Sequence, residues 1–148
     1  MMRHYYIYLI EEEFANHYFG RESKIYHLFL EFDRTSVMYK KKLLKMQIDY
    51  VTKPIHSLRI HQLIETQLKK RTDYYLDRNA HVLLQANNRS HAKLVVHDRY
   101  LSLQANGNYE AETIFFEILR KENRCFLAMD LQMDRYGWLA PIKERKFV

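Results

Sequence analysis

The most informative stretch of the chain is RHYYIYLI at residues 3–10. In an extended chain its side chains are apolar or aromatic on both sides, with Tyr6, Tyr8 and Ile10 on one face and Tyr5, Ile7 and Leu9 on the other. Strands that are buried on both faces have this nearly continuous apolar character. The segment therefore predicts a strand that is covered on both sides and lies centrally in a sheet.

Four helical patterns follow this strand. The first opens with three glutamates at residues 11–13 and ends at Gly20, because acidic residues suit the start of a helix and glycine suits its end. Apolar residues at helical spacing predict further helices over residues 23–32 and 37–51. Pro54 ends the third helix, and Ser57 is the expected N-cap of a fourth that closes in the basic run at residues 69–71.

Beyond Asn79 the pattern changes from helical to strand-like. Short β-prone runs at residues 82–85, 92–96 and 100–104 predict an antiparallel meander. Residues 109–122 carry the clearest helical stripe, and two further strands, at 125–130 and 136–142, flank a turn around Asp134. We therefore predict an α+β fold: a single compact domain over residues 1–148, with a mostly antiparallel sheet, N-terminal helices and one long helix in the C-terminal half.

The composition agrees with one globular domain. The chain has 148 residues, 47% of them hydrophobic, with only three glycines and two prolines, so we find no flexible linker. Cys125 is the only cysteine, which excludes a disulfide within the chain. No signal-peptide pattern is found at the N-terminus, and the first apolar run is far shorter than the roughly 20 residues of a membrane span. We therefore expect a cytoplasmic protein with no membrane role.

The chain lacks the motifs of common enzyme sites. Its glycines are far apart, which argues against a phosphate-binding loop. Cys125 begins an apolar run, where a thiol is more often a buried small hydrophobe than a nucleophile. His56 and His61, and likewise His91 and His97, lack the spacing of a metal-binding helix. We therefore expect no enzyme activity, no cofactor, no metal and no small-molecule substrate.

Four carboxylates leave a catalytic alternative open, because a general acid and a general base need only be close in the folded protein. They are Glu110, Glu112, Asp130 and Asp134. The first pair is explained by favourable charges at the start of a helix, and the second by the frequent use of aspartate in turns. We interpret both pairs as structural.

The net charge of +6 favours acidic partners, which could be nucleic acid or a protein surface. Basic residues cluster in three runs, which are Lys40, Lys41, Lys42 and Lys45; Lys69, Lys70 and Arg71; and Lys143, Arg145 and Lys146. No helix-turn-helix turn, zinc-finger spacing or aromatic RNP-type strand accompanies these runs. We expect no specific recognition of nucleic acid, and a basic DNA-binding protein is the alternative.

Surplus aromatic residues point to a protein-binding surface. Phe14 and Tyr18 fall at positions i and i+4 of the short first helix, while Ala15 and Phe19 occupy the adjacent track. A helix this short rarely buries both of these pairs of side chains. We therefore expect Phe14 and Tyr18 to face outward and Phe19 to belong to the core. Gln47 and Tyr50 form a second outward stripe on the third helix, and exposed aromatic residues of this kind are typical binding hot spots. The alternative is that these aromatic residues are simply core.

Long segments at both ends of the chain resemble one known family. They are RHYYIYLI at 3–10 and EEFANHYFGRES at 12–23, then YEAETIFFEIL at 109–119, CFLAMD at 125–130 and RYGWLAPIKERKFV at 135–148. These strings are similar to the SirA family, the sporulation inhibitors of replication of endospore-forming bacilli. Residues 31–105 form a more divergent middle.

The resemblance implies a small cytosolic protein without enzyme activity. Such a protein binds the N-terminal domain of the replication initiator DnaA and blocks new rounds of initiation as a cell commits to sporulation; the alternative becomes a DNA-binding protein acting at the replication origin. The family's contact residues correspond to Phe14 and Tyr18 in the segment FANHYFG, and to Gln47 and Tyr50 in QIDYVTKPI at 47–55. Arg21 is added as a residue at the rim, because it is close to these in sequence.

Overall fold

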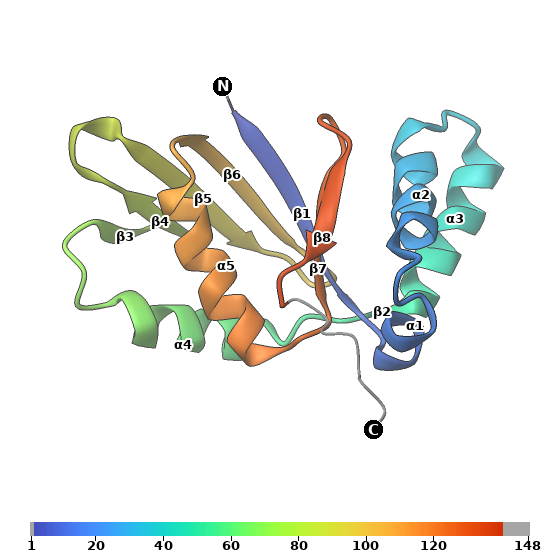
Figure 1. Ribbon diagram of the computed structural model, residues 1–148, viewed down its shortest axis with the longest axis horizontal. Coiled ribbons are helices and arrows are strands. Elements are labelled where there is room, and N and C mark those ends of the chain that lie inside the picture. The colour runs from blue at the N-terminus through green and yellow to red at the C-terminus, as the bar shows by residue number, and fades with distance from the viewer. Residues whose placement is uncertain (1, 141–148) are drawn as a thin grey trace.

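Residues 2–140 are described by a computed structural model of the protein, in which eight strands form one sheet (Figure 1). Every strand pairs with its neighbours in antiparallel fashion, in the order β3, β4, β5, β6, β1, β7, β8, and β2 also pairs with β1. The strands are β1 (Arg3–Ile10), β2 (Thr52–Lys53), β3 (Tyr74–Asp77), β4 (Ala80–Leu84), β5 (Ser90–Val96), β6 (Leu101–Gly107), β7 (Phe126–Asp130) and β8 (Arg135–Trp138). The α+β class and the mostly antiparallel sheet are confirmed.

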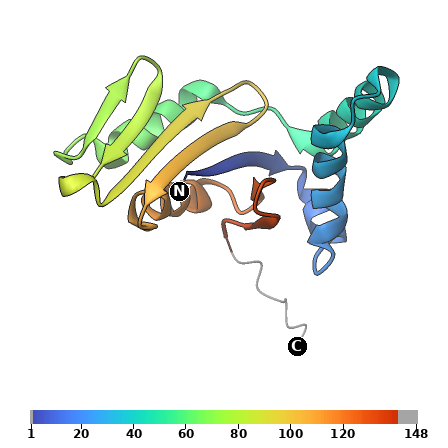
Figure 2. The ribbon, with the colours of Figure 1, turned by 90° about the horizontal axis from the view of Figure 1, so that it is seen from above.

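The helices of the described residues form two groups (Figures 1 and 2). They are α1 (Glu12–His17), α2 (Glu22–Arg34), α3 (Met38–Val51), α4 (Ser57–Leu68) and α5 (Glu110–Glu122), and a short 3-10 turn covers Ala86–Asn88. Helices α4 and α5 pack against one face of the sheet and bury the apolar side chains of that face. Helices α1, α2 and α3 stand together beside the end of the sheet that β7 and β8 form.

β1 is central in the sheet, as its two apolar faces predict. It pairs with β6 on one side, where Tyr5 lies opposite Leu103, and with β7 on the other, where Tyr6 lies opposite Met129. Ile7 is completely buried in the core between the sheet and the α4–α5 layer. The backbone groups of β1 are thus satisfied from both sides, which is what a strand covered on both faces requires.

Aromatic contacts join helix α2 to the face of the sheet opposite the one that α4 and α5 cover. The ring of Tyr8 on β1 lies 4.5 Å from that of Phe29 on α2, measured between centroids. The ring of Tyr26 on α2 stacks on Tyr136 of β8 at 4.4 Å, and the Tyr26 hydroxyl donates to the Asp134 carboxylate. Tyr26 is almost completely buried, so α2 is fixed to the sheet by side chains rather than by the backbone.

Some elements differ from the prediction in length. The first helix ends at His17, three residues before Gly20, whose φ of +77° lies in the connection to α2. Helix α4 begins at Ser57, but its N-cap residue is His56, which makes no capping hydrogen bond through its side chain. β8 covers Arg135–Trp138, and the last positions of the predicted strand at 136–142 lie outside the described residues.

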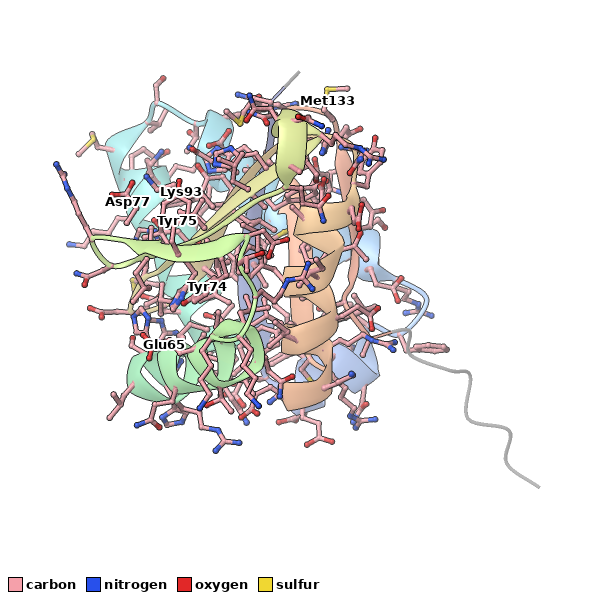
Figure 3. The ribbon with its side chains drawn as sticks, turned by 90° about the vertical axis from the view of Figure 1, so that its left-hand side faces the viewer. Glu65, Tyr74, Tyr75, Asp77, Lys93 and Met133 are labelled. Atoms are coloured by element: carbon pink, nitrogen blue, oxygen red, sulfur yellow. The ribbon has the colours of Figure 1, made fainter. Side chains whose placement is uncertain are left out.

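β3 was not predicted at all. It pairs only with β4, through a two-residue connection at Arg78 and Asn79, where Arg78 takes a φ of 59°. Such hairpin turns usually contain glycine, so this one carries no clear sequence signal. Figure 3 shows Tyr74 on the side of β3 that faces α4, with Tyr75, Asp77 and Lys93 on the other side and Met133 at the distant β7–β8 turn.

Candidate protein-binding surface

The first helix is fixed to the end of α3 by the backbone that leaves the central strand. The amide of Ile10 donates to the carbonyl of Cys125, and the amide of Glu11 donates to the carbonyl of Val51 at 2.8 Å. Ala15 then buries its methyl group against the core, where it is the buried residue of α1. These contacts place α1 beside the C-terminal turn of α3.

This placement brings two of the predicted binding residues into contact. The ring centroids of Phe14 and Tyr50 are 5.4 Å apart with the planes at 66°, an edge-to-face arrangement. Phe14 is half-buried and packs against the core, whereas Tyr50 is 74% exposed. The pair therefore presents a large aromatic surface that is supported from beneath.

The other predicted residues lie close in sequence to one or the other member of this pair. Tyr18 is half-buried at the C-cap of α1, with its ring 4.9 Å from that of His17. Gln47 is exposed one turn before Tyr50 on α3. Arg21 is exposed, and its amide donates to the carbonyl of Tyr18 at 2.7 Å. We call Phe14, Tyr18, Gln47 and Tyr50, with Arg21, the aromatic patch.

The assignment of the two tracks of the first helix needs correction. Phe19 is 40% exposed rather than part of the core. Because α1 ends at His17, Phe19 lies outside the helix and is not placed on the same helical face as Ala15. Phe14 and Tyr18 are half-buried rather than fully outward, so the buried anchor of α1 is Ala15 alone.

A network around Asp49 holds the C-terminal turn of α3 in place. Nη2 of Arg99 donates to the carbonyls of Asp49 and Thr52, at 3.0 and 3.1 Å, and to the Thr52 hydroxyl. Nζ of Lys45 lies 2.6 Å from the Asp49 carboxylate. An arginine that donates to the last carbonyls of a helix also complements the helix dipole. This network was missed from the sequence, since Arg99 lies between β5 and β6, far from α3 along the chain.

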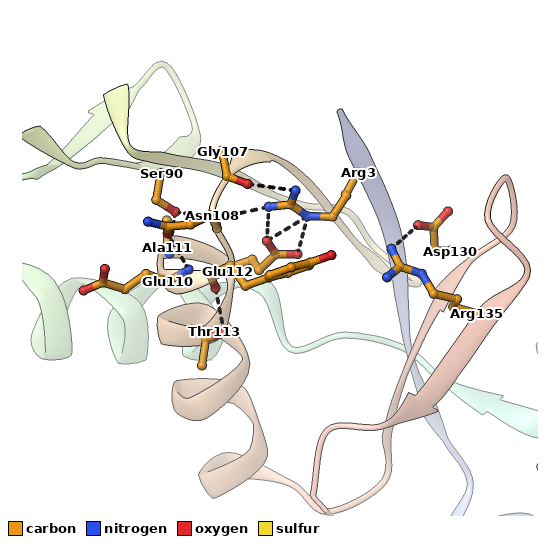
Figure 4. Close-up of polar contacts among 11 residues, drawn as sticks. Arg3, Ser90, Gly107, Asn108, Glu110, Ala111, Glu112, Thr113, Asp130 and Arg135 are labelled. Carbon is orange, nitrogen blue, oxygen red and sulfur yellow. Dashed lines mark hydrogen bonds and ion pairs between the residues drawn. The ribbon is translucent and has the colours of Figure 1, made fainter. Parts of the chain in front are cut away.

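Three of the four carboxylates considered for acid–base chemistry, Glu112, Asp130 and Asp134, have structural partners, two of which Figure 4 shows. Glu112 is buried and forms an ion pair with Arg3, whose Nε lies 2.9 Å from its Oε1. Arg3 also donates to the carbonyls of Gly107 and Asn108. The carboxylate at the start of α5 is therefore neutralised and fully engaged.

Asp130 stabilises the turn that the sequence predicts, although its side chain is buried rather than solvated. Its Oδ1 accepts from the amide of Met133 at 3.1 Å, and its Oδ2 accepts from Arg135 at 3.0 Å. Cys125 is buried, as predicted, and burial raises the pKa of its thiol. A buried thiol with a raised pKa is a poor nucleophile.

The histidines form a different cluster from the pairs considered in the sequence. Nδ1 of His61 and Nε2 of His81 are 2.7 Å apart, and Nδ1 of His81 is 2.7 Å from the Tyr74 hydroxyl. His81 is completely buried. Burial, and to a lesser degree His61, lower the pKa of His81 to about 4. Over residues 2–140, no three His, Cys, Asp or Glu side chains gather as potential metal ligands.

No helix within residues 2–140 combines the length and the apolar character needed to cross a membrane.

Two comparisons with known proteins agree with each other. The family model described as "Sporulation inhibitor of replication protein SirA" matches residues 3–143. A curated protein of that same name from Bacillus subtilis (strain 168) is 48% identical over 149 residues, and the alignment covers the whole of both chains. The chain therefore belongs to the SirA family of sporulation inhibitors of replication.

Proposed function

We propose that this protein inhibits the initiation of DNA replication during sporulation by binding the N-terminal domain of the initiator DnaA through the aromatic patch. The family name supports the replication-inhibitor role, and the correspondence of Phe14, Tyr18, Gln47 and Tyr50 to the family's contact residues supports the choice of partner. The protein acts in the cytoplasm and by binding alone, without catalysis.

The observation that carries this proposal is the contact between Phe14 and Tyr50. Two aromatic residues from distant segments meet edge to face, and one of them exposes most of its ring. Aromatic side chains bury a large area for few rotatable bonds, so they dominate many interfaces. Because Arg99 holds the end of α3, the Tyr50 backbone is already ordered before a partner arrives, which lowers the entropic cost of binding.

The other polar groups of the protein support a binding role. The carboxylates Glu112 and Asp130 are occupied by arginines and backbone groups, and the single thiol is buried. A binding inhibitor needs a rigid surface and no such reactive group.

Calorimetric titration of the initiator tests the proposal. Tyr50→Ala should raise the Kd for full-length initiator by roughly 30-fold or more, which corresponds to about 2 kcal/mol, the scale of a hot-spot aromatic residue. Its melting temperature should hardly change, because the ring is mostly exposed. An initiator that lacks its N-terminal domain should not bind.

Tyr75→Ala is the matched control, since Tyr75 is a 47% exposed tyrosine on the edge strand β3. This variant should bind like the wild type. Wild-type protein that fails to bind the initiator, or Tyr50→Ala that binds with full affinity while folded, would contradict the proposal.

A further inference from the structure

The outward face of α3 carries a row of large apolar side chains that no other described part of the chain covers. We call this row the α3 stripe; it consists of Tyr39, Leu43, Met46 and Tyr50, which are 73%, 53%, 62% and 74% exposed. At about 100° per residue, the four side chains fall within about 60° of one another around the helix, over a length of about 16 Å. The inward face of α3 is formed by Leu44 and Ile48, which are buried.

A stripe with this spacing is the pattern of a helix that lies in a groove of a partner. Anchors at positions i, i+4, i+7 and i+11 of one helix are typical of helix-in-groove recognition. Contiguous exposed apolar residues are also rare on proteins that remain free in solution. The stripe is therefore a docking feature rather than an ordinary scatter of exposed residues.

The stripe is continuous with the aromatic patch. Its last member, Tyr50, is the residue that contacts Phe14. A stable interface usually involves about 20–30 residues on each side and about 800 Å² per partner, far more than the five residues of the patch supply. The next exposed apolar side chains along α3 are Met46, Leu43 and Tyr39, so they are the natural continuation of the same interface.

The charges beside the stripe indicate which partner fits. Helix α3 has four lysines against one aspartate. Lys40 is paired with Glu31 and Lys45 with Asp49, whereas Lys42 is exposed directly beside the stripe. Packing two copies of α3 against each other would bring two basic helices together, which like charges disfavour. An acidic partner surface is complementary instead.

We infer that the partner covers the whole α3 stripe, and that it does so with an apolar groove whose rim carries acidic side chains. This inference rests on the proposed function, so the occupant is the initiator domain that binds the aromatic patch. Tyr39, Leu43 and Met46 contribute to affinity, and Lys42 faces the acidic rim.

The test compares four variants by calorimetry with full-length initiator, with sedimentation to give the oligomeric state. Leu43→Glu and Met46→Glu place an acid where the groove is apolar and its rim acidic, so each should raise the Kd more than 10-fold. Lys42→Glu should raise the Kd at least threefold, and less so at high salt because screening weakens the repulsion. Leu58→Glu is the control, since Leu58 is a 72% exposed leucine on α4 and its substitution should leave the Kd unchanged.

The outcomes separate this inference from the proposed function. If Tyr50→Ala weakens binding but Leu43→Glu and Met46→Glu do not, the interface ends at the patch and the inference is wrong while the proposed function stands. If the wild-type protein does not bind the initiator, both the inference and the proposed function are wrong. A wild-type dimer that Leu43→Glu converts to monomers would identify a second copy of the chain as the occupant, and the inference would be wrong. Should a glutamate variant melt early, Leu43→Gln and Met46→Gln give the same comparison with a neutral side chain.

Discussion

At the scale of single residues, the cluster of His61, His81 and Tyr74 makes the stability of the protein sensitive to acid. His81 is completely buried and its pKa is lowered to about 4, so it stays neutral in the folded protein until the pH falls close to that value. In the unfolded chain the same imidazole takes up a proton below about pH 6.5. The contribution of neutral His81 to the free energy of unfolding is therefore fully present above pH 6.5 and is lost as the pH falls toward 4.

We expect the free energy of unfolding to fall by about 2–3 kcal/mol between pH 6.5 and pH 4, at about 1.4 kcal/mol per unit of pKa difference. Urea denaturation at several pH values measures this slope. His81→Gln should remove most of the slope, whereas His56→Gln, which changes an exposed histidine, should keep it. An unchanged slope in His81→Gln would show that other groups cause the acid sensitivity.

The ion pair between Arg3 and Glu112 could not be predicted from the sequence. Glu112 lies in the first turn of α5, where favourable interaction with the helix dipole explained it well enough. Its actual partner is 109 positions away along the chain, and a pairing over that distance depends on the sheet order. The ion pair could be recognised only once β1 and the start of α5 were known to be neighbours.

At the scale of elements, the end of α1 explains why two phenylalanines five positions apart differ in burial. Phe14 is half-buried against the core and the ring of Tyr50, whereas Phe19 lies beyond the end of the helix and is exposed. We expect Phe14→Ala to lower the free energy of unfolding by about 1–2 kcal/mol, part of the cost of removing a fully buried phenylalanine. Phe19→Ala should change it by less than about 1 kcal/mol.

Thermal melts of the two variants beside the wild type check this order. Phe14→Ala should also weaken initiator binding, because Tyr50 loses its supporting ring. A larger loss of stability in Phe19→Ala than in Phe14→Ala would mean that α1 continues past His17 in solution.

The elements that could be predicted are those whose signals are local. Strand β1 has a nearly continuous apolar run, and helices α3 and α5 have apolar residues at helical spacing. The bounds of all three agree closely with the prediction. Strand β3 and the two-residue strand β2 have no period long enough to detect. The error at Phe19 has a similar cause, because the helix ends at His17, before Phe19, and a difference of two or three residues in the end of a short helix moves a side chain from the core to the surface.

At the scale of the whole molecule, the positive charge is divided among several elements rather than gathered into one groove-reading motif. Lys40, Lys45 and Arg71 are each paired with a carboxylate, and the third basic run, at residues 143–146, lies outside the described residues. We expect no preference for origin duplex DNA over a scrambled duplex in gel-shift titrations near physiological salt. Non-specific binding of both duplexes should weaken steeply with salt.

A clear preference for origin sequence, retained as salt is raised, would favour the alternative of a DNA-binding protein. Tyr50→Ala provides the internal control, since loss of a tyrosine on the aromatic patch should alter initiator binding without altering weak binding to DNA.

The central position of β1 has a consequence for the order of events during synthesis. The strand is synthesised well before its partners β6 and β7, which begin at Leu101 and Phe126. At about 5–20 residues per second, the wait for β6 alone is about 5–20 seconds. During that interval RHYYIYLI is an unpaired, tyrosine-rich segment of the kind that aggregates or recruits chaperones. Translation speed over residues 11–107 thus sets how long this segment stays unpaired.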